Sequence, residues 1–223
     1  MATTRRSFLA VGSSALLAGC ASSSHATAHA KRDEPEEEVT PAEDLMREHG
    51  VLRRVMYVYD DAALRLDGNT EVPLDALLGC AGIVRRVIED YHEKLEESFL
   101  FPRFEKAGQL ADLTAILRQQ HQVGRSLTDQ IVTLARAPLD RAKLATVLRR
   151  FNHMYRPHAA REDTILLPAL RGLIGDHEYE ELGEQFEDKE KQMLGEHGFD
   201  RAVADVAKLE QAFGVDDLAK LTG

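Results

Sequence analysis

The sequence predicts an all-α fold, an up-down-up-down four-helix bundle with additional C-terminal helices. Three observations support this prediction. Apolar residues recur at helical spacing through four long segments, and short links join these segments. No segment alternates apolar and polar residues as a half-buried strand would. The 223 residues give room for one domain with extensions, and the scarcity of aromatic residues indicates a mainly aliphatic core.

The chain divides into four predicted parts. Residues 1–20 are typical of an export signal, and the small, polar and charged residues 21–40 are typical of a flexible linker. Residues 41–172 are predicted to form the bundle, and residues 173–223 a helical extension.

The predicted signal combines two features. Arg5-Arg6 before a short apolar run resembles a twin-arginine export signal, and Leu17-Ala18-Gly19-Cys20 resembles a lipobox. We therefore expect Cys20 to be lipidated, with a plain cleaved signal peptide as the alternative. The mature protein would be periplasmic or on the outer face of a membrane, held to the membrane only by its lipid.

The first bundle helix is predicted to begin after Thr40, because Thr40-Pro41-Ala42-Glu43 offers a hydroxyl N-cap and a first-turn Pro. The second runs from about Pro73 past Glu97, the third over about 110–135, and the fourth over about 139–173. Two more helices, at about 179–196 and 199–213, are expected outside the bundle. The predicted inward residues are Leu45, Leu52, Met56, Tyr59, Ala63 and Leu66, then Leu74, Leu77, Ala81, Val84, Ile88, Leu95 and Phe99, then Leu110, Leu113, Leu117, Gly124, Leu127, Ile131 and Leu134, and finally Leu144, Leu148, Phe151, Tyr155, Ile165 and Ala169.

Each bundle helix also places one His on its apolar stripe. The second and fourth helices repeat one stretch, HEKLEESFLFP at 92–102 and HAAREDTILLP at 158–168, in which a Glu follows the His by one turn. A lone His on such a stripe is more often a hydrogen-bonded core residue. Two buried carboxylates without cations, however, would cost several kcal/mol each. The set therefore predicts a metal site, and its members are His49, His92, Glu96, His121, His158 and Glu162.

Imidazole and carboxylate ligands without thiolate favour iron or manganese, and zinc less specifically. The same six residues and the Leu-Phe-Pro tail after Glu96 resemble a hemerythrin-like domain of the HHE cation-binding type, over about residues 41–172. This resemblance implies an oxo- or hydroxo-bridged di-iron centre with Glu96 and Glu162 as bridges, and manganese or zinc is expected less. It also implies binding of O₂ or a related small molecule.

The chain departs from the oxygen-carrying hemerythrins at two positions. They have a fifth His where this chain has Arg125. They also use as a ligand an Asp at the place of Asp163, whereas in this chain the preceding Glu162 is better aligned with His158. Glu93 is a candidate extra ligand, and its alternative is a solvated position. Tyr155 is expected to pack in the core with a hydroxyl hydrogen bond. His153 is expected on the surface.

The expected function is that of an exported di-iron protein that binds a diatomic ligand or peroxide, for sensing, storage or scavenging. Two alternatives use the same site: a redox enzyme acting on peroxide or nitric oxide, and an iron-handling or metal-stapled structural protein. The sequence supplies no dedicated catalytic acid, nucleophile or electron-carrier motif, so it assigns no catalytic residue. The net charge of −10, without a basic block, argues against a nucleic-acid partner.

Overall fold

The computed structural model describes residues 39–136 and 138–221, and these residues form helices without strands. The predicted signal, with Cys20, and nearly all of the predicted linker lie outside the described residues. Within the described ranges, no helix combines the length and apolar content needed to cross a membrane.

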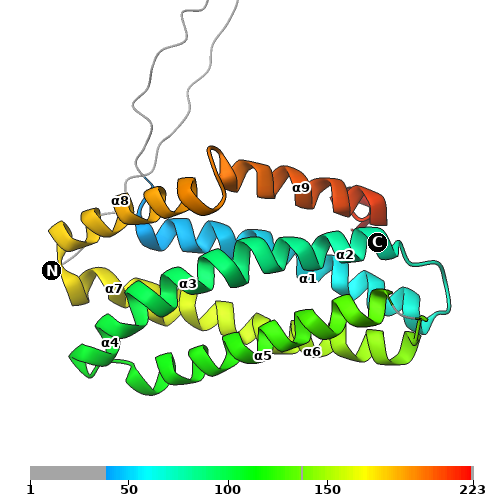
Figure 1. Cartoon of the computed structure of the whole chain (residues 1–223), viewed down its shortest axis with the longest axis horizontal. Coiled ribbons are helices and arrows are strands. Elements are labelled where there is room, and N and C mark those ends of the chain that lie inside the picture. Colours follow the sequence, from blue (N-terminus) through cyan, green and yellow to red (C-terminus); the bar gives the residue numbers. More distant parts are fainter. Residues whose placement is uncertain (1–38, 137, 222–223) are drawn as a thin grey trace, which may run out of the picture. The chain divides into compact units, whose positions relative to one another are not determined.

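Four helical rods form the bundle (Figure 1). Two are single helices, α1 (Pro41–Asp67) and α5 (Ala111–Arg136), and two are composite. The second rod joins α2 (Leu74–Ile83), η1 (Val84–His92), α3 (Glu93–Leu95), η2 (Glu96–Leu100) and α4 (Phe101–Ala107). The fourth joins α6 (Arg141–Arg161), η3 (Glu162–Leu166) and α7 (Leu167–Ile174). The segments η1, η2 and η3 are π-helical.

Packing between the rods confirms the all-α bundle. α1 contacts both α6 and the α2–η1 segment, and α5 contacts the same two neighbours. Two additional helices follow, α8 (Asp176–Met193) and α9 (Gly198–Phe213), and a short 3₁₀ turn, η4 (Leu218–Leu221), comes last. α9 packs on α1 and α2, whereas α8 packs on α1 and α7.

α1 begins directly after Thr40, its predicted N-cap. Thr40 Oγ1 accepts a hydrogen bond from the backbone N–H of Glu43 at 3.3 Å, and Pro41 occupies the first turn. Asp140 caps α6 in the same way, through the N–H of Lys143 at 3.1 Å.

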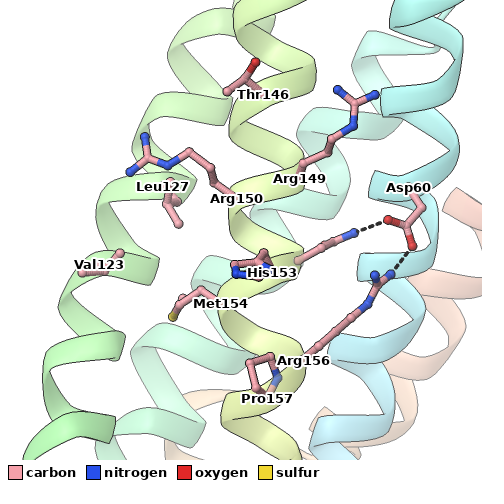
Figure 2. A pocket seen from close by; sticks show the side chains of 11 residues that line it. Asp60, Val123, Leu127, Thr146, Arg149, Arg150, His153, Met154, Arg156 and Pro157 are labelled. Atoms are coloured by element: carbon pink, nitrogen blue, oxygen red, sulfur yellow. Dashed lines mark hydrogen bonds and ion pairs between the residues drawn. The ribbon is translucent and has the colours of Figure 1, made fainter.

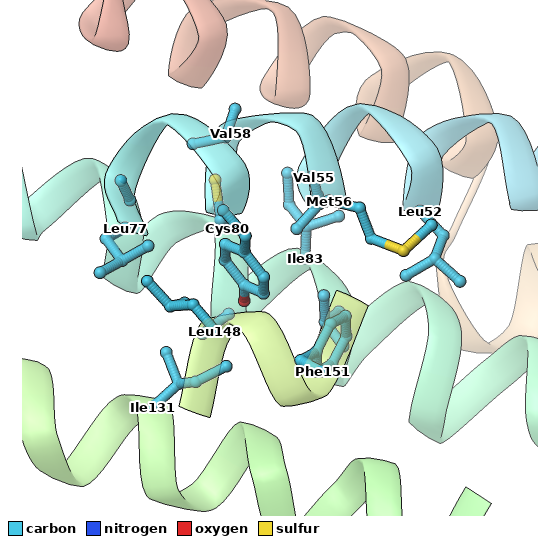
Figure 3. Packing of buried hydrophobic residues seen from close by; sticks show 14 of the residues in the cluster. Leu52, Val55, Met56, Val58, Leu77, Cys80, Ile83, Ile131, Leu148 and Phe151 are labelled. Atoms are coloured by element: carbon cyan, nitrogen blue, oxygen red, sulfur yellow. The ribbon is translucent and has the colours of Figure 1, made fainter. Parts of the chain in front are cut away.

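Buried apolar residues form two clusters. One is centred on α1, α2, α5 and α6 and includes Val55, Cys80 and Phe151 (Figure 3). The other lies nearer α4, α7 and α8 and includes Leu117 and Leu166. Along α1, α5 and the fourth rod, the inward His stands where the stripe passes from one cluster to the other. The bundle therefore holds a buried polar layer between two apolar layers.

The π-helical turns change which residues face the core. An α-helical period places Phe99 and Ile165 inside. Phe99 is partly buried and packs against the second cluster, whereas the prediction for Ile165 was wrong, because this side chain is 44% exposed. The next residue of each rod, Leu100 or Leu166, is fully buried. The N–H of Phe101 bonds to the carbonyl of Glu96, five residues back, and Leu167 bonds likewise to Glu162. Each wide turn thus moves the inward position by one residue.

The repeated prolines lie next to these turns. Pro102 and Pro168 each follow the repeated Glu by six residues, and each stands in the first turn of the next α-helix. A Pro has no N–H to donate and its ring clashes with the carbonyl four residues back in a regular α-helix. A preceding π-helical turn relieves that conflict because its bonds already reach five residues back.

α5 and α6 approach each other closely at one glycine. A Cβ atom on Gly124 would lie 2.0 Å from the hydroxyl oxygen of Tyr155 and 2.6 Å from its Cζ. The absence of a side chain at Gly124 is therefore what seats the buried Tyr155 ring.

We expect Gly124→Ala to lower the free energy of unfolding by about 1–3 kcal/mol, because the added methyl overpacks the core. The matched control is Gly82→Ala in α2, where a Cβ meets nothing within 4 Å. That change should be neutral or stabilising by about 0.4–1 kcal/mol. Urea unfolding of the two variants measures the difference, and equal effects would show that Tyr155 has room to move.

Candidate metal centre

The structure brings the six predicted side chains together. All six are buried, and they form two groups of four in which every pair of candidate ligand atoms lies within 4.8 Å. One group contains His49 and His92, and the other contains His121 and His158. Glu96 and Glu162 belong to both groups. The arrangement has the donor set of a two-ion site with shared carboxylates.

Each shared carboxylate faces one imidazole from each group. Glu162 Oε2 lies 3.3 Å from His49 Nε2 and 3.1 Å from His158 Nε2. Glu96 Oε2 lies 3.3 Å from His121 Nε2 and 3.6 Å from His92 Nε2. These ring nitrogens and carboxylate oxygens therefore point into one small volume at the centre of the bundle.

The unsatisfied polar atoms are consistent with a cation site in this volume. None of the four carboxylate oxygens of Glu96 and Glu162 has a hydrogen-bond partner of good geometry within the described ranges, nor does Nε2 of His92 or His121. Buried polar atoms are nearly always satisfied, so a cluster of unpaired acceptors is typical of a site that binds a cation.

The electrostatics agree with this reading. Burial opposes protonation of His49 and His121, but neighbouring carboxylates outweigh burial and raise both pKa values to about 10. Burial also opposes ionisation of Glu162, yet His158 and His49 hold its pKa well below its ordinary value. Burial lowers the pKa of His92 to about 4. Without a metal, the carboxylates would draw protons onto two imidazoles, and metal ions can supply that positive charge instead.

The other ring nitrogen of each His is held by a neighbour. His92 Nδ1 lies 2.6 Å from Glu48, and His158 Nδ1 lies 2.9 Å from Gln120. Such contacts fix the ring orientation and leave Nε2 for a metal. The remaining pairs are His49 with Asp163 at 2.6 Å and His121 with Glu97 at 3.1 Å.

These contacts repeat between the two halves of the bundle. Glu48 and Gln120 each directly precede the His of their own helix, and each holds the His of the next rod. Glu97 and Asp163 each directly follow a shared Glu, and each holds a His from the other half. The charge of the repeat differs at one place, where Glu48 of one half corresponds to Gln120 of the other. The sequence singled out Asp163 beside Glu162 but indicated no role for Glu48, Glu97 or Gln120.

Glu93 lies beside the centre rather than in either group of four. Its Oε1 accepts a hydrogen bond from the Tyr155 hydroxyl at 2.7 Å, and its Oε2 lies 2.7 Å from Arg125 Nη2. Burial raises the pKa of Glu93 to about 7. Arg125, at the place of the fifth His, also contacts Glu97 at 2.7 Å. The arginine therefore occupies that place as an ion-pair partner of two acids, and Glu93 remains only a proposed ligand.

His153 does not belong to this buried set, as predicted. It lies exposed in a surface hollow of about 920 Å³ between α5 and α6, among Arg149, Arg150 and Arg156 (Figure 2). Asp60 pairs with Arg156 on the same face.

The charge difference between Glu48 and Gln120 generates a prediction. We expect Glu48→Gln to weaken metal binding about 10–100-fold, because a carboxylate against the ring raises the basicity of the His ligand. Gln120→Glu should strengthen binding through His158 for the same reason. Competition with a metal chelator measures both effects, and Gln119→Glu on the exposed side of α5 controls for added charge. Equal affinities in all variants would contradict a role for these contacts.

Comparisons with known proteins agree with this geometry. The family model of the hemerythrin HHE cation-binding domain matches residues 40–170. The chain is 42% identical to "Uncharacterized protein Rv1995" of Mycobacterium tuberculosis and to "Uncharacterized protein Mb2018" of Mycobacterium bovis. Each alignment covers 99% of this chain and 91% of the relative. No solved structure shows significant similarity. The family match and the buried His and Glu groups together show that this chain is a metal-binding member of the hemerythrin HHE cation-binding domain family.

Proposed function

We propose that this protein holds two iron ions and binds O₂ or a related small ligand, such as a diatomic molecule or peroxide. The observation that supports the proposal is the pair of four-residue groups that share Glu96 and Glu162. In each group two imidazoles and the two shared carboxylates would hold one ion. Bound iron would supply the capacity to bind a small ligand.

Iron is the proposed metal because of the donor set. Imidazole nitrogen and carboxylate oxygen suit iron or manganese, and the described residues bring no thiolate into either group. Bound iron would supply the redox and ligand-binding chemistry. The six residues would hold the ions in a buried layer, and Glu48, Asp163, Glu97 and Gln120 fix the four imidazole rings.

Metal analysis combined with absorption spectra tests this proposal. We expect about two iron ions per chain, as in other helix-bundle di-iron sites. A visible absorption band should change on addition of azide or peroxide. His49→Ala and His121→Ala should each lose at least half of the iron and the azide response. His153→Ala and His177→Ala, on exposed histidines, are the matched controls.

Two further outcomes separate the rival functions. Steady consumption of peroxide or nitric oxide with a reductant would indicate a redox enzyme, whereas one ligand bound per centre would indicate sensing, storage or scavenging. A protein that remains colourless and iron-free after anaerobic loading with ferrous iron would contradict the proposal. A loss of folding on chelation would favour a metal-stapled structural role instead.

We also propose that the protein is exported and anchored by lipid on Cys20, on the basis of the Arg5-Arg6 pair and the lipobox-like residues before Cys20. Cys20→Ser should release the exported chain from the membrane fraction into the soluble fraction, and Arg5→Lys/Arg6→Lys should block its export. Cell fractionation measures both. Cys80→Ser, at the buried second cysteine, is the control. A Cys20→Ser chain that remains in the membrane fraction would contradict lipidation at this position.

A further inference from the structure

The charge of α6 is opposite to that of the chain as a whole. Its 21 residues include five Arg and one Lys, and they include no Asp or Glu. The whole chain, in contrast, has 28 basic and 38 acidic residues. The exposed face of α6 therefore presents positive charge on an acidic protein, and this segregation indicates that the helix has anionic contacts.

Two arginines of α6 have their anionic contacts inside the chain. Arg149 pairs with Asp67 of α1. Arg156 pairs with Asp60 of the same helix (Figure 2), which also accepts a hydrogen bond from Asn152 at 2.8 Å. These pairs join α6 to α1 and neutralise the side of α6 that faces α1.

The cations on the side of α6 that faces α5 are unpaired. Arg150 and His153 both line the hollow of about 920 Å³, and within the described part of the chain neither has an ion pair or a side-chain hydrogen bond. Being three residues apart, they lie on one face of the helix. Figure 2 shows the Arg150 side chain reaching from α6 toward Leu127 of α5, with His153 below it on the same helix.

Apolar side chains line the hollow next to these two cations. Val123 and Leu127 come from α5, and Met154 and Pro157 come from α6. Val123 is 40% exposed and Leu127 only 2%, so the apolar wall runs from the surface into the groove between the helices. The volume of the hollow lies within the roughly 300–1,000 Å³ of small-molecule sites.

A second hollow, of about 660 Å³, adjoins the first along α5 and α6. The two hollows share Thr146 and Arg150, so the Arg150 side chain stands where they meet. The second hollow adds apolar surface from Leu134 and Val147. A ligand held at Arg150 can therefore extend in either direction along the groove.

Exposed acids border this face of the molecule and argue against a broad anionic partner such as a membrane surface. Asp67 of α1, Asp129 of α5 and Asp140 before α6 are all exposed. A flat anionic surface would meet these acids together with the arginines, whereas a small anion can reach Arg150 alone. The charge pattern therefore favours a soluble ligand.

We propose that the groove between α5 and α6 binds a soluble organic phosphate, whose anionic group contacts Arg150 and His153. Its apolar part packs on Val123, Leu127 and Met154. The planar guanidinium group matches phosphate with two parallel hydrogen bonds, and an imidazole ring supplies at least one further N–H donor. None of these residues belongs to the two His–Glu groups, so the site is independent of the proposed metal.

Calorimetric titration with phenyl phosphate tests the proposal, because this probe carries a phosphate on an apolar ring. We expect saturable binding of one phenyl phosphate per chain. Inorganic phosphate should bind at least about tenfold more weakly, because it buries no apolar surface. Benzoate should also bind more weakly, because it carries a single negative charge. An affinity for inorganic phosphate or benzoate equal to that for phenyl phosphate would overturn the assignment of an organic phosphate.

Arg150→Gln/His153→Gln removes both proposed phosphate contacts and should weaken phenyl phosphate binding about tenfold or more. Arg161→Gln/His177→Gln is the matched control, because both of its residues are exposed, Arg161 lies on the same helix, and neither lines the hollow. Its affinity should stay within about twofold of the unmodified protein. Equal affinities in the two double variants would overturn the site. The iron content and the melting temperature should be the same in both.

A second pair of variants tests the apolar wall. Val123→Glu places a carboxylate in the wall and should weaken phenyl phosphate binding about tenfold, through repulsion of the phosphate and loss of apolar contact. Ile116→Glu makes the same change at another exposed position of α5, which does not line the hollow. It should alter the affinity less than about twofold. Equal affinities in these two variants would likewise overturn the site.

Cosedimentation with phosphatidylglycerol vesicles separates a soluble ligand from a lipid headgroup. We expect the Cys20→Ser chain, which cannot carry lipid at this position, to remain in the supernatant. Vesicle binding that is lost in Arg150→Gln/His153→Gln, without any binding of phenyl phosphate, would overturn the proposal in favour of a lipid headgroup. A protein that binds iron can fail this test and a protein without iron can pass it, so the two proposals stand or fall separately.

Discussion

The structure depends on the burial of two carboxylates, Glu96 and Glu162, in the middle of a helical bundle. Two ionised acids at this depth are stable only with matching positive charge. Four imidazoles surround them, and the electrostatics show that the acids would pull protons onto two of these rings if no cation were present. The polar layer, the paired histidines and the separation of the apolar core into two clusters all follow from this constraint.

Much of the fold could be read from the sequence because four stripes of apolar residues recur at helical spacing. The inward positions of the six site residues followed from the same periodicity, and the cap at Thr40 followed from local side-chain chemistry. The prediction for Ile165 failed because an α-helical period cannot anticipate a π-helical turn. The prolines at 102 and 168 were visible signals, but their effect on hydrogen bonding depends on the surrounding backbone.

Contacts across helices were the least predictable part of the site. Glu48 and Gln120 look like ordinary polar neighbours of a His in the sequence, and only the packed rods reveal which ring each one holds. The role of Arg125 could not be predicted either, because its ion pairs with Glu93 and Glu97 depend on how the helices pack. The two halves thus share one design with a charge difference. That difference makes the two His–Glu groups chemically unequal.

The wide turns after Glu96 and Glu162 have a consequence for how the molecule can change. Before each turn, the acids and imidazoles fix how the helix is rotated about its axis. After the turn, Leu100 or Leu166 fixes this rotation by packing in the second apolar cluster. The additional residue in each turn lets the helix before it and the helix after it differ in rotation about the rod axis. Substitutions in α4 or α7 can therefore repack the far end of the bundle without rotating the acids away from each other.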